Sequence, residues 1–164
     1  MAERAWIRGA QRGSVDDLER LFREHWPRAF RAARLVTGDA AAAEDIAQEA
    51  FLAAVRNLDR FDRRRPFGPW LHRIVVNRAI DWTRARRLRA EVELGDHLAA
   101  PVHDGGGGEV LGRISDLPAE HRAVVVLRYV LEYTPGEIAQ LLDLPRGTVN
   151  SRLRRGLDRM KGSL

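Results

Sequence analysis

The sequence predicts an all-α protein with two small helical domains, joined by a flexible acidic linker, and a helix-turn-helix in the C-terminal domain. Three observations support this fold class. The periodic stretches carry apolar residues at helical spacing, and none alternates as a half-buried strand does. A glycine run at 105–108 interrupts the chain, and charge falls in separate blocks. With 164 residues, 45% of them hydrophobic, the chain can bury a core in each domain.

The linker is predicted between residues 91 and 109. This stretch lacks helical periodicity and ends in Gly105–Gly108, which is too flexible to hold an element. The domains are therefore expected at 14–90 and 110–162.

The first helix of the N-terminal domain should begin after Ser14, because Asp17 follows three residues later in a pattern that resembles a capping box. Pro27 is expected to interrupt or restart this helix. Gly38 and Asp39 should then end it and cap the next one.

The second helix is predicted from about 40 to 58, and its two sides differ. At 100° per residue, one side is apolar and should be core. Its residues are Ile46, Ala47, Ala50, Phe51, Ala54 and Leu58. The opposite side carries Asp45, Gln48, Glu49, Leu52 and Arg56. An exposed leucine among polar groups hints at a protein-binding face, although an ordinary solvated face explains the pattern as well.

Residues 61–70 should form a loop, because two prolines and a glycine interrupt the periodicity. Arginines mixed with aromatic rings suit single-stranded nucleic acid, since cations meet phosphates and rings stack on unpaired bases. The residues in question are Phe61, Arg63, Arg64, Arg65, Phe67 and Trp70. In the alternative, the rings are buried and only the arginines face water, which is expected for Trp70 and Phe67.

A long helix should follow from Trp70 to about Arg89. Leu71, Val75, Val76, Ala79 and Trp82 would form its buried side. A polar stripe at helical spacing comprises Arg73, Asn77, Asp81 and Arg84, and the helix ends in further arginines, among them Arg87. Arginine can contact phosphates, and asparagine can pair with a base edge.

The C-terminal domain shows a helix-turn-helix pattern. Thr134-Pro135-Gly136-Glu137 is a capping box that opens a short helix, and Asp143-Leu144-Pro145 is the turn. A longer basic helix begins near Arg146, and such a helix enters the major groove of DNA. Its side opposite the apolar residues carries Arg146, Thr148, Asn150, Ser151, Arg154 and Arg155. Spacing does not decide which of these contact bases and which contact phosphates, and a plain helical hairpin is the alternative.

The charge pattern favours two separate polyanion contacts. The net charge is +5, and all but one of the 28 basic residues are arginine. Residues 60–89 carry net +8 and residues 146–161 net +5, whereas 37–59 carry −4 and 90–120 carry −6. An arginine-rich coding bias would explain the composition but not this placement.

Other function classes are excluded or disfavoured. The absence of cysteine excludes disulfides, thiolate zinc sites and a cysteine nucleophile. The five histidines lie at none of the usual metal spacings, so neither a metal nor a cofactor is expected. No convincing carboxylate cluster or nucleophile–base set indicates an enzyme. No apolar run could span a membrane, and no secretory signal is recognised, so membrane insertion is not expected.

Taken together, the motifs resemble those of an extracytoplasmic-function (ECF) sigma factor, the promoter-recognition subunit of bacterial RNA polymerase. The resemblance covers about residues 14–162. It is carried by the segments 35–39, 43–51, 61–62 and 67–74 with Asn77, and by 137–139 and 145–153. Asp143 stands where glycine is common, so it should adopt a left-handed conformation, which aspartate tolerates. Asn150 stands where lysine or arginine is frequent in the family. The run Arg63–Arg65 makes the loop more basic than is usual in the family.

The resemblance implies a role for each surface and a cytoplasmic, non-enzymatic protein. Asp45, Gln48, Glu49 and Leu52 would bind core RNA polymerase. The loop from Phe61 to Phe67 and the stripe through Arg73, Asn77 and Arg84 would open and recognise the minus-ten element, with Arg87 in the basic helix end. The helix from Arg146 would recognise the minus-thirty-five element. The partners would be polymerase, promoter DNA as duplex and melted non-template strand, and an anti-sigma protein. The alternative is a stand-alone helix-turn-helix regulator.

Overall fold

The computed structural model describes residues 2–94 and 108–162, and within these residues it contains helices and no strand. The N-terminal part comprises α1 (Ala2–Gln11), α2 (Val15–Thr37), α3 (Ala40–Arg56), the short 3-10 helix η1 (Leu58–Arg60) and α4 (Phe67–Leu94). The C-terminal part comprises α5 (Gly108–Ser115), α6 (Ala119–Tyr129), α7 (Pro135–Leu142) and α8 (Arg146–Gly162). The prediction of an all-α protein is confirmed.

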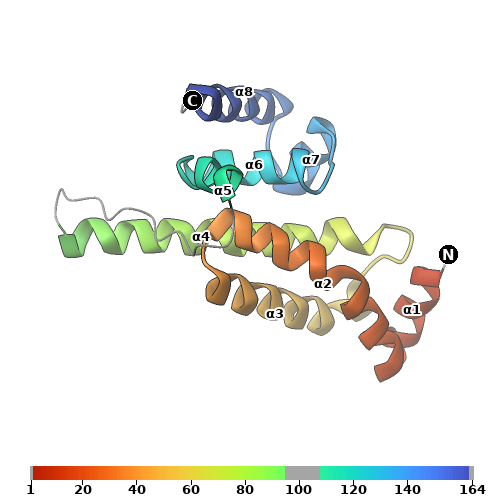
Figure 1. The fold of residues 1–164 in the computed structure, drawn as a ribbon. Coiled ribbons are helices and arrows are strands. Elements are labelled where there is room, and N and C mark those ends of the chain that lie inside the picture. The colour runs from red at the N-terminus through yellow and green to blue at the C-terminus, as the bar shows by residue number, and fades with distance from the viewer. Residues whose placement is uncertain (1, 95–107, 163–164) are drawn as a thin grey trace.

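The N-terminal domain is built on α2, α3 and α4, which pack against one another, with α1 against α2 (Figure 1). The side of α3 predicted to be core is buried, and small alanines such as Ala47 and Ala50 let the helices approach closely. Gly38 ends α2 with a left-handed φ of 72°, and the Asp39 side chain accepts a hydrogen bond from the Ala42 N–H at the start of α3. The predicted stop and cap are therefore confirmed.

The expectation that Pro27 interrupts or restarts the first long helix is wrong. α2 runs through Pro27 without a break. A proline inside a helix costs about 3 kcal/mol through the lost hydrogen bond and the clash with the preceding turn. Leu21 before Pro27 and Ala29 and Ala33 after it are fully buried in the same core. Burial on both sides of the proline offsets that cost.

The fourth helix begins and ends outside its predicted bounds. It starts at Phe67 rather than Trp70, so Gly68 and Pro69 lie in its first turn, where a proline's missing N–H has no helical partner to lose. It also extends to Leu94, into the segment predicted as linker. The remainder of that linker, residues 95–107, lies outside the described residues.

In the C-terminal domain, α6 lies between α8 and the N-terminal domain (Figure 1). The Thr134–Glu137 capping box is present, and Asp143 has the predicted left-handed φ of 55°. Contacts of α6 with α2 and α4, and of α7 with α4, dock the two domains on each other. Neither this docking nor helices α1 and α5 were predicted from the sequence.

Candidate nucleic-acid and polymerase interfaces

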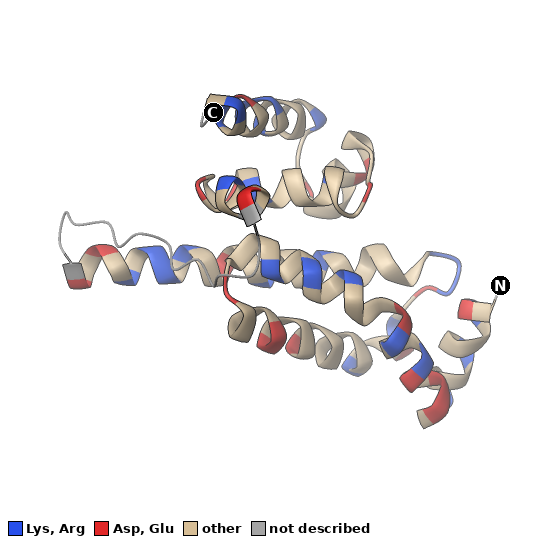
Figure 2. Cartoon of the chain, in the orientation of Figure 1, with Lys and Arg blue, Asp and Glu red and all other residues tan. Residues whose placement is uncertain are grey.

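Helix α8 presents a basic face to solvent. Val149 and Leu153 bury its other side against α6 and α7. The polar residues predicted to contact DNA are exposed or half-buried: Arg146, Thr148, Asn150, Ser151, Arg154 and Arg155. Because α8 forms the layer farthest from the N-terminal domain, domain docking leaves this face uncovered (Figures 1 and 2).

A shallow hollow of about 520 Å³ lies between α6 and the first turns of α8. Thr148, Ser151 and Arg155 line it from α8, and His121 lines it from α6. Burial lowers the pKa of His121, and the charge of Arg152 acts in the same direction. The hollow therefore combines hydroxyl donors and arginine charge with the carboxylate of Glu120, which also lines it.

The polar face of α3 is exposed. Asp45, Gln48 and Glu49 all face solvent, and the Leu52 side chain among them is 55% exposed. Glu49 forms an ion pair with Arg78 of α4 at 3.2 Å. This α3 face lies on the opposite side of the molecule from α8 (Figure 1).

The arginine loop (residues 61–66) joins η1 to α4. Arg63, Arg64 and Arg65 are exposed, but their surroundings differ. The Arg64 guanidinium donates two hydrogen bonds to the Asp62 carboxylate, at 3.0 and 3.2 Å, and the Arg64 backbone N–H donates a third at 3.0 Å. These bonds lower the pKa of Asp62. Arg64 thus orders the loop, while Arg63 and Arg65 extend from it.

The aromatic rings beside the arginines are not exposed. Phe61 is 9% exposed and Phe67 is 2% exposed. Their rings meet edge to face, and Trp70, which is partly buried, stacks on Phe61 with centroids 4.6 Å apart. The alternative of buried rings therefore holds for Phe61 and Phe67, whose rings support the loop from beneath in this structure. Their contact with DNA stays a prediction. A run of apolar rings gains more from burial than from exposure.

The predicted stripe on α4 is exposed, and domain docking engages one end of it. Arg73 and Asn77 face solvent. Arg84 is also exposed, but its guanidinium forms an ion pair with Glu120 of α6. Burial acts to raise the pKa of Glu120, but hydrogen bonds from Arg84 and from the backbone outweigh it and lower the pKa. Arg87 is exposed, with Glu91 at 3.8 Å one turn later.

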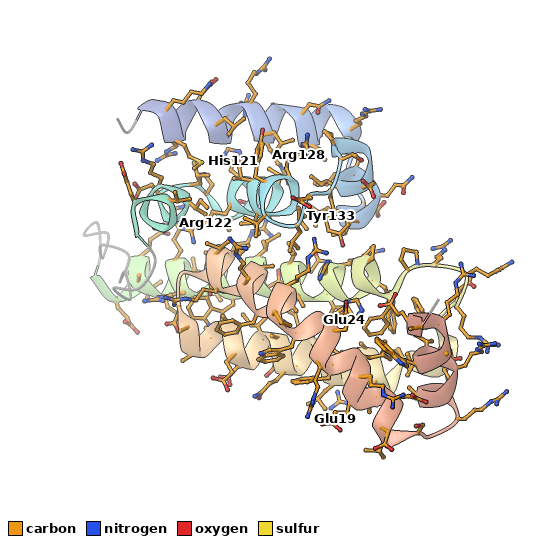
Figure 3. All side chains as sticks on the ribbon, turned by 45° about the vertical axis from the view of Figure 1, so that its right-hand side comes forward. Glu19, Glu24, His121, Arg122, Arg128 and Tyr133 are labelled. Carbon is orange, nitrogen blue, oxygen red and sulfur yellow. The ribbon has the colours of Figure 1, made fainter. Side chains whose placement is uncertain are left out.

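Polar side chains connect the docked domains. His72 of α4, only 2% exposed, shares a 2.6 Å hydrogen bond between its Nδ1 and the hydroxyl of Tyr133. The Arg122 guanidinium donates to the carbonyl oxygen of Val36 in α2 at 2.8 Å, and Arg28 donates to that of Leu131 at 2.9 Å. Arg122 and Tyr133 point toward the N-terminal domain (Figure 3). None of these residues was singled out from the sequence, because each partner lies far away along the chain.

A groove of about 1130 Å³ runs between the domains. Arg65 and Arg73 line it from the N-terminal domain, and Tyr133, Glu137 and Asp143 line it from the C-terminal domain. Part of the surface predicted to contact the minus-ten element therefore faces the helix-turn-helix in the docked arrangement.

The described residues contain no group of histidine, aspartate and glutamate side chains placed to hold a metal ion. Within the same residues, no helix is long and apolar enough to cross a membrane.

An exposed basic helix in a helix-turn-helix, with a second arginine-rich helical domain, defines a two-domain DNA-binding protein. The chain belongs to the sigma-70 family, as an ECF RNA polymerase sigma factor. Residues 21–89 match the model for sigma-70 region 2, and residues 108–160 match that for region 4. The chain is 32% identical to the ECF sigma factor SigW of Bacillus subtilis (strain 168), over 96% of this chain and 94% of the relative.

Further relatives agree with this assignment. SigL of Mycobacterium tuberculosis (strain ATCC 25618 / H37Rv) is 34% identical, over 91% of this chain and 89% of its own. Among solved structures, CnrH in complex with the cytosolic domain of CnrY has a TM-score of 0.76 at 28% identity, covering 99% of this chain and 96% of that one. RpoE of Bartonella quintana in complex with the anti-sigma factor NepR shares the fold, with a TM-score of 0.73 at 20% identity, covering 90% and 96%. The stand-alone regulator is not favoured, because it gives no role to region 2.

Proposed function

We propose that the chain directs core RNA polymerase to specific promoters and assists strand opening, as a non-catalytic subunit that acts in the cytoplasm. The observation that carries this proposal is the separation of two surfaces of opposite charge. The acidic α3 face and the basic α8 face lie on opposite sides of the molecule (Figures 1 and 2). One chain can therefore hold polymerase on one side and duplex DNA on the other.

The α3 face is the proposed contact with core polymerase. Asp45 and Glu49 supply charge for a basic partner surface, Gln48 supplies an amide, and the exposed Leu52 supplies apolar area at the centre. An apolar anchor inside a polar rim is the usual composition of a protein interface.

The α8 face is the proposed contact with the minus-thirty-five element. Arg146, Arg154 and Arg155 offer guanidinium groups to phosphates or to guanine edges. Thr148, Asn150 and Ser151 offer shorter donors and acceptors on the same face. Hydrogen bonds to base edges supply specificity, and those to phosphates fix the register of the helix in the groove.

The arginine loop and the α4 stripe are the proposed contact with the melted minus-ten element. Arg63, Arg65 and Arg87 would hold the phosphates of the non-template strand, and Arg73, Asn77 and Arg84 would line its path. Opening the duplex costs a few kcal/mol for each flipped base, which contacts to the unpaired base must offset.

Promoter binding should require the domains to separate. The two elements lie about 25 base pairs apart by their names, which is about 85 Å of duplex at 3.4 Å per base pair. The longest helix, α4 with 28 residues, measures only about 42 Å. Docked domains cannot reach both elements along straight DNA, so we propose that the docked arrangement is the form before promoter binding.

An anti-sigma protein is also a proposed partner. Two structural relatives were solved as complexes, one with the cytosolic domain of CnrY and one with the anti-sigma factor NepR. An equivalent regulator of this chain would have to cover the α3 face, the arginine loop or the α8 face to block transcription.

The polymerase contact is tested with purified core enzyme. Asp45→Arg should abolish co-purification, because it places a cation where the partner surface is expected to be basic. Asp16→Arg is the matched control, since Asp16 is an exposed acid in the first turn of α2 and far from α3 along the chain. Runoff transcription on a genomic promoter library then tests promoter choice. Failure of the wild-type chain to bind polymerase, or binding without start-site selection, would overturn the proposal.

The strand-opening role is tested with Asn77→Ala on a promoter found in that library. Permanganate reactivity of unpaired thymines should fall several-fold, while binding to the closed duplex should remain. Equal loss of both would show that Asn77 has no special role in the melted strand.

A further inference from the structure

Helix α1 precedes the segment that matches region 2, yet it is part of the N-terminal domain. Ile7 is buried to 1% exposure in the domain core, and Trp6 packs against the same core. α1 contacts α2 and also η1, which leads directly into the arginine loop. α1 therefore lies where its polar side chains can reach the arginine loop.

Gln11, at the end of α1, binds the chain where the arginine loop begins. Its Nε2 donates to the carbonyl oxygen of Leu58 at 2.9 Å and to that of Phe61 at 3.3 Å. These two bonds span 47 and 50 residues of sequence. One side-chain amide nitrogen has two hydrogens, and both carbonyls near the start of the loop receive one.

Glu3, two turns earlier in α1, acts near the other end of the loop. Its carboxylate forms a hydrogen bond with Nε2 of His25 in α2. The His25 ring packs on Phe67, the first residue of α4, with centroids 5.0 Å apart. The ring also lies close to Gly68, where an added Cβ would come within 3.5 Å of it. α1 therefore contacts the start of the loop directly through Gln11 and is linked to its end through His25.

We propose that α1 is a brace for the arginine loop and that Gln11 is its positioning residue. This inference rests on the proposed role of the loop in binding the melted strand. Holding the carbonyls of Leu58 and Phe61 fixes the backbone from which Arg63 and Arg65 extend. A loop ordered before binding loses less conformational entropy when the strand is bound, so the brace strengthens strand binding without touching DNA.

Two substitutions remove the donor while keeping the size of the side chain. Gln11→Met has no polar donor, and Gln11→Glu places carboxylate oxygens against carbonyl oxygens. Arg8→Gln is the control for Gln11→Glu, because Arg8 is exposed on the same helix and its loss changes the net charge equally. The melting temperature and polymerase binding of each variant show whether the fold and the α3 face are intact.

Hydrogen exchange of the free protein tests the brace directly. Amides of residues 57–65 should exchange at least several-fold faster in both Gln11 variants, with those of α3 unchanged. Binding to a single-stranded minus-ten oligonucleotide and open-complex formation should each fall about tenfold, which corresponds to about 1.4 kcal/mol. The Arg8→Gln variant should match wild type in exchange of the loop and lose less than threefold in binding.

The outcomes separate the brace from the function on which it rests. Wild-type exchange rates in the loop of both Gln11 variants would overturn the brace, whatever the protein does on DNA. Faster exchange with unchanged strand binding and open-complex formation would overturn the positioning role of Gln11. Failure of the wild-type chain to bind polymerase or to open a promoter would instead overturn the proposed function.

Discussion

The contact between the two domains contains more side-chain hydrogen bonds than the interior of the N-terminal domain, although one apolar core extends through both. Between α2, α3 and α4 the buried residues are mainly apolar, with Ala32, Ala47 and Leu71 fully covered. Across the domain contact, the side-chain hydrogen bonds include those of Arg28 and Arg122, the His72–Tyr133 pair and the Arg84–Glu120 pair. Apolar area can be satisfied only by burial, whereas polar groups can exchange their partners for water.

The domain contact is therefore the easier of the two packings to open. Separating the helices of the N-terminal core would expose apolar area at about 25 cal/mol per Å². Separating the domains would also expose the part of the apolar core that they share, but it would return guanidinium, phenol and carbonyl groups to water, which binds them well. The polar groups at the domain contact thus support a fixed domain interior and a domain contact that opens on promoter binding.

The largest effect is expected from Phe51→Ala in the core. Phe51 is 5% exposed and its ring meets Phe22 with centroids 5.0 Å apart, so truncation should lower the free energy of unfolding by about 3–5 kcal/mol. Leu52→Ala, one residue further on the exposed face of α3, should change it by about 0.5 kcal/mol or less. Urea unfolding of both variants measures this, and similar losses in the two would contradict the burial pattern.

A pH effect of about 3 kcal/mol is expected from His72 at the domain contact. Burial lowers its pKa to about 4, and the charges of His25 and Arg28 act in the same direction. As the pH falls below about 6.5, the unfolded chain takes up the proton first, so stability present at neutral pH is lost progressively down to about pH 4.

The measurement is the free energy of unfolding at several pH values for wild type and His72→Phe, which cannot titrate. The wild-type profile should be steeper between pH 6.5 and 4. Parallel profiles would show that His72 does not resist protonation in the folded protein.

Tyr133→Phe should lower stability by about 1 kcal/mol. It removes the hydroxyl that bonds to His72, whose other ring nitrogen, Nε2, has no hydrogen-bond partner among the described residues. Burial raises the pKa of Tyr133 to about 12, so its hydroxyl is protonated at neutral pH. Tyr129→Phe is the matched control, because Tyr129 is exposed and should be nearly neutral on thermal unfolding. Equal losses of stability in the two variants would show that the Tyr133–His72 hydrogen bond does not stabilise the domain contact.

The smallest effect is expected from the Arg84–Glu120 ion pair between the domains. Both side chains reach solvent, so a double-mutant cycle with Arg84→Gln and Glu120→Gln should give a coupling energy of about 0.2–1 kcal/mol. The coupling should weaken further in high salt. A coupling above about 2 kcal/mol would mean that charge pairing dominates the domain contact and would contradict a contact that opens easily.

Local patterns predicted much of each helix. The capping residues Asp39 and Thr134 and the two sides of α3 follow from neighbouring residues in the chain, because caps and helical faces depend on spacings of three or four residues. The left-handed Asp143 was expected from the family resemblance, because glycine is common at this place in the turn. The exposed α3 face and the exposed α8 face, which carry the proposed function, were found in the same way.

Local periodicity and charge were therefore enough to predict the helical class, the helix-turn-helix and the polar faces. Long-range packing, by contrast, carries α2 through Pro27, buries Phe61, brings Gln11 to the start of the arginine loop and brings His72 to Tyr133. Each of these depends on groups brought together from distant parts of the chain. Burial and long-range hydrogen bonds outweigh local preference there, and no short sequence window contains both partners.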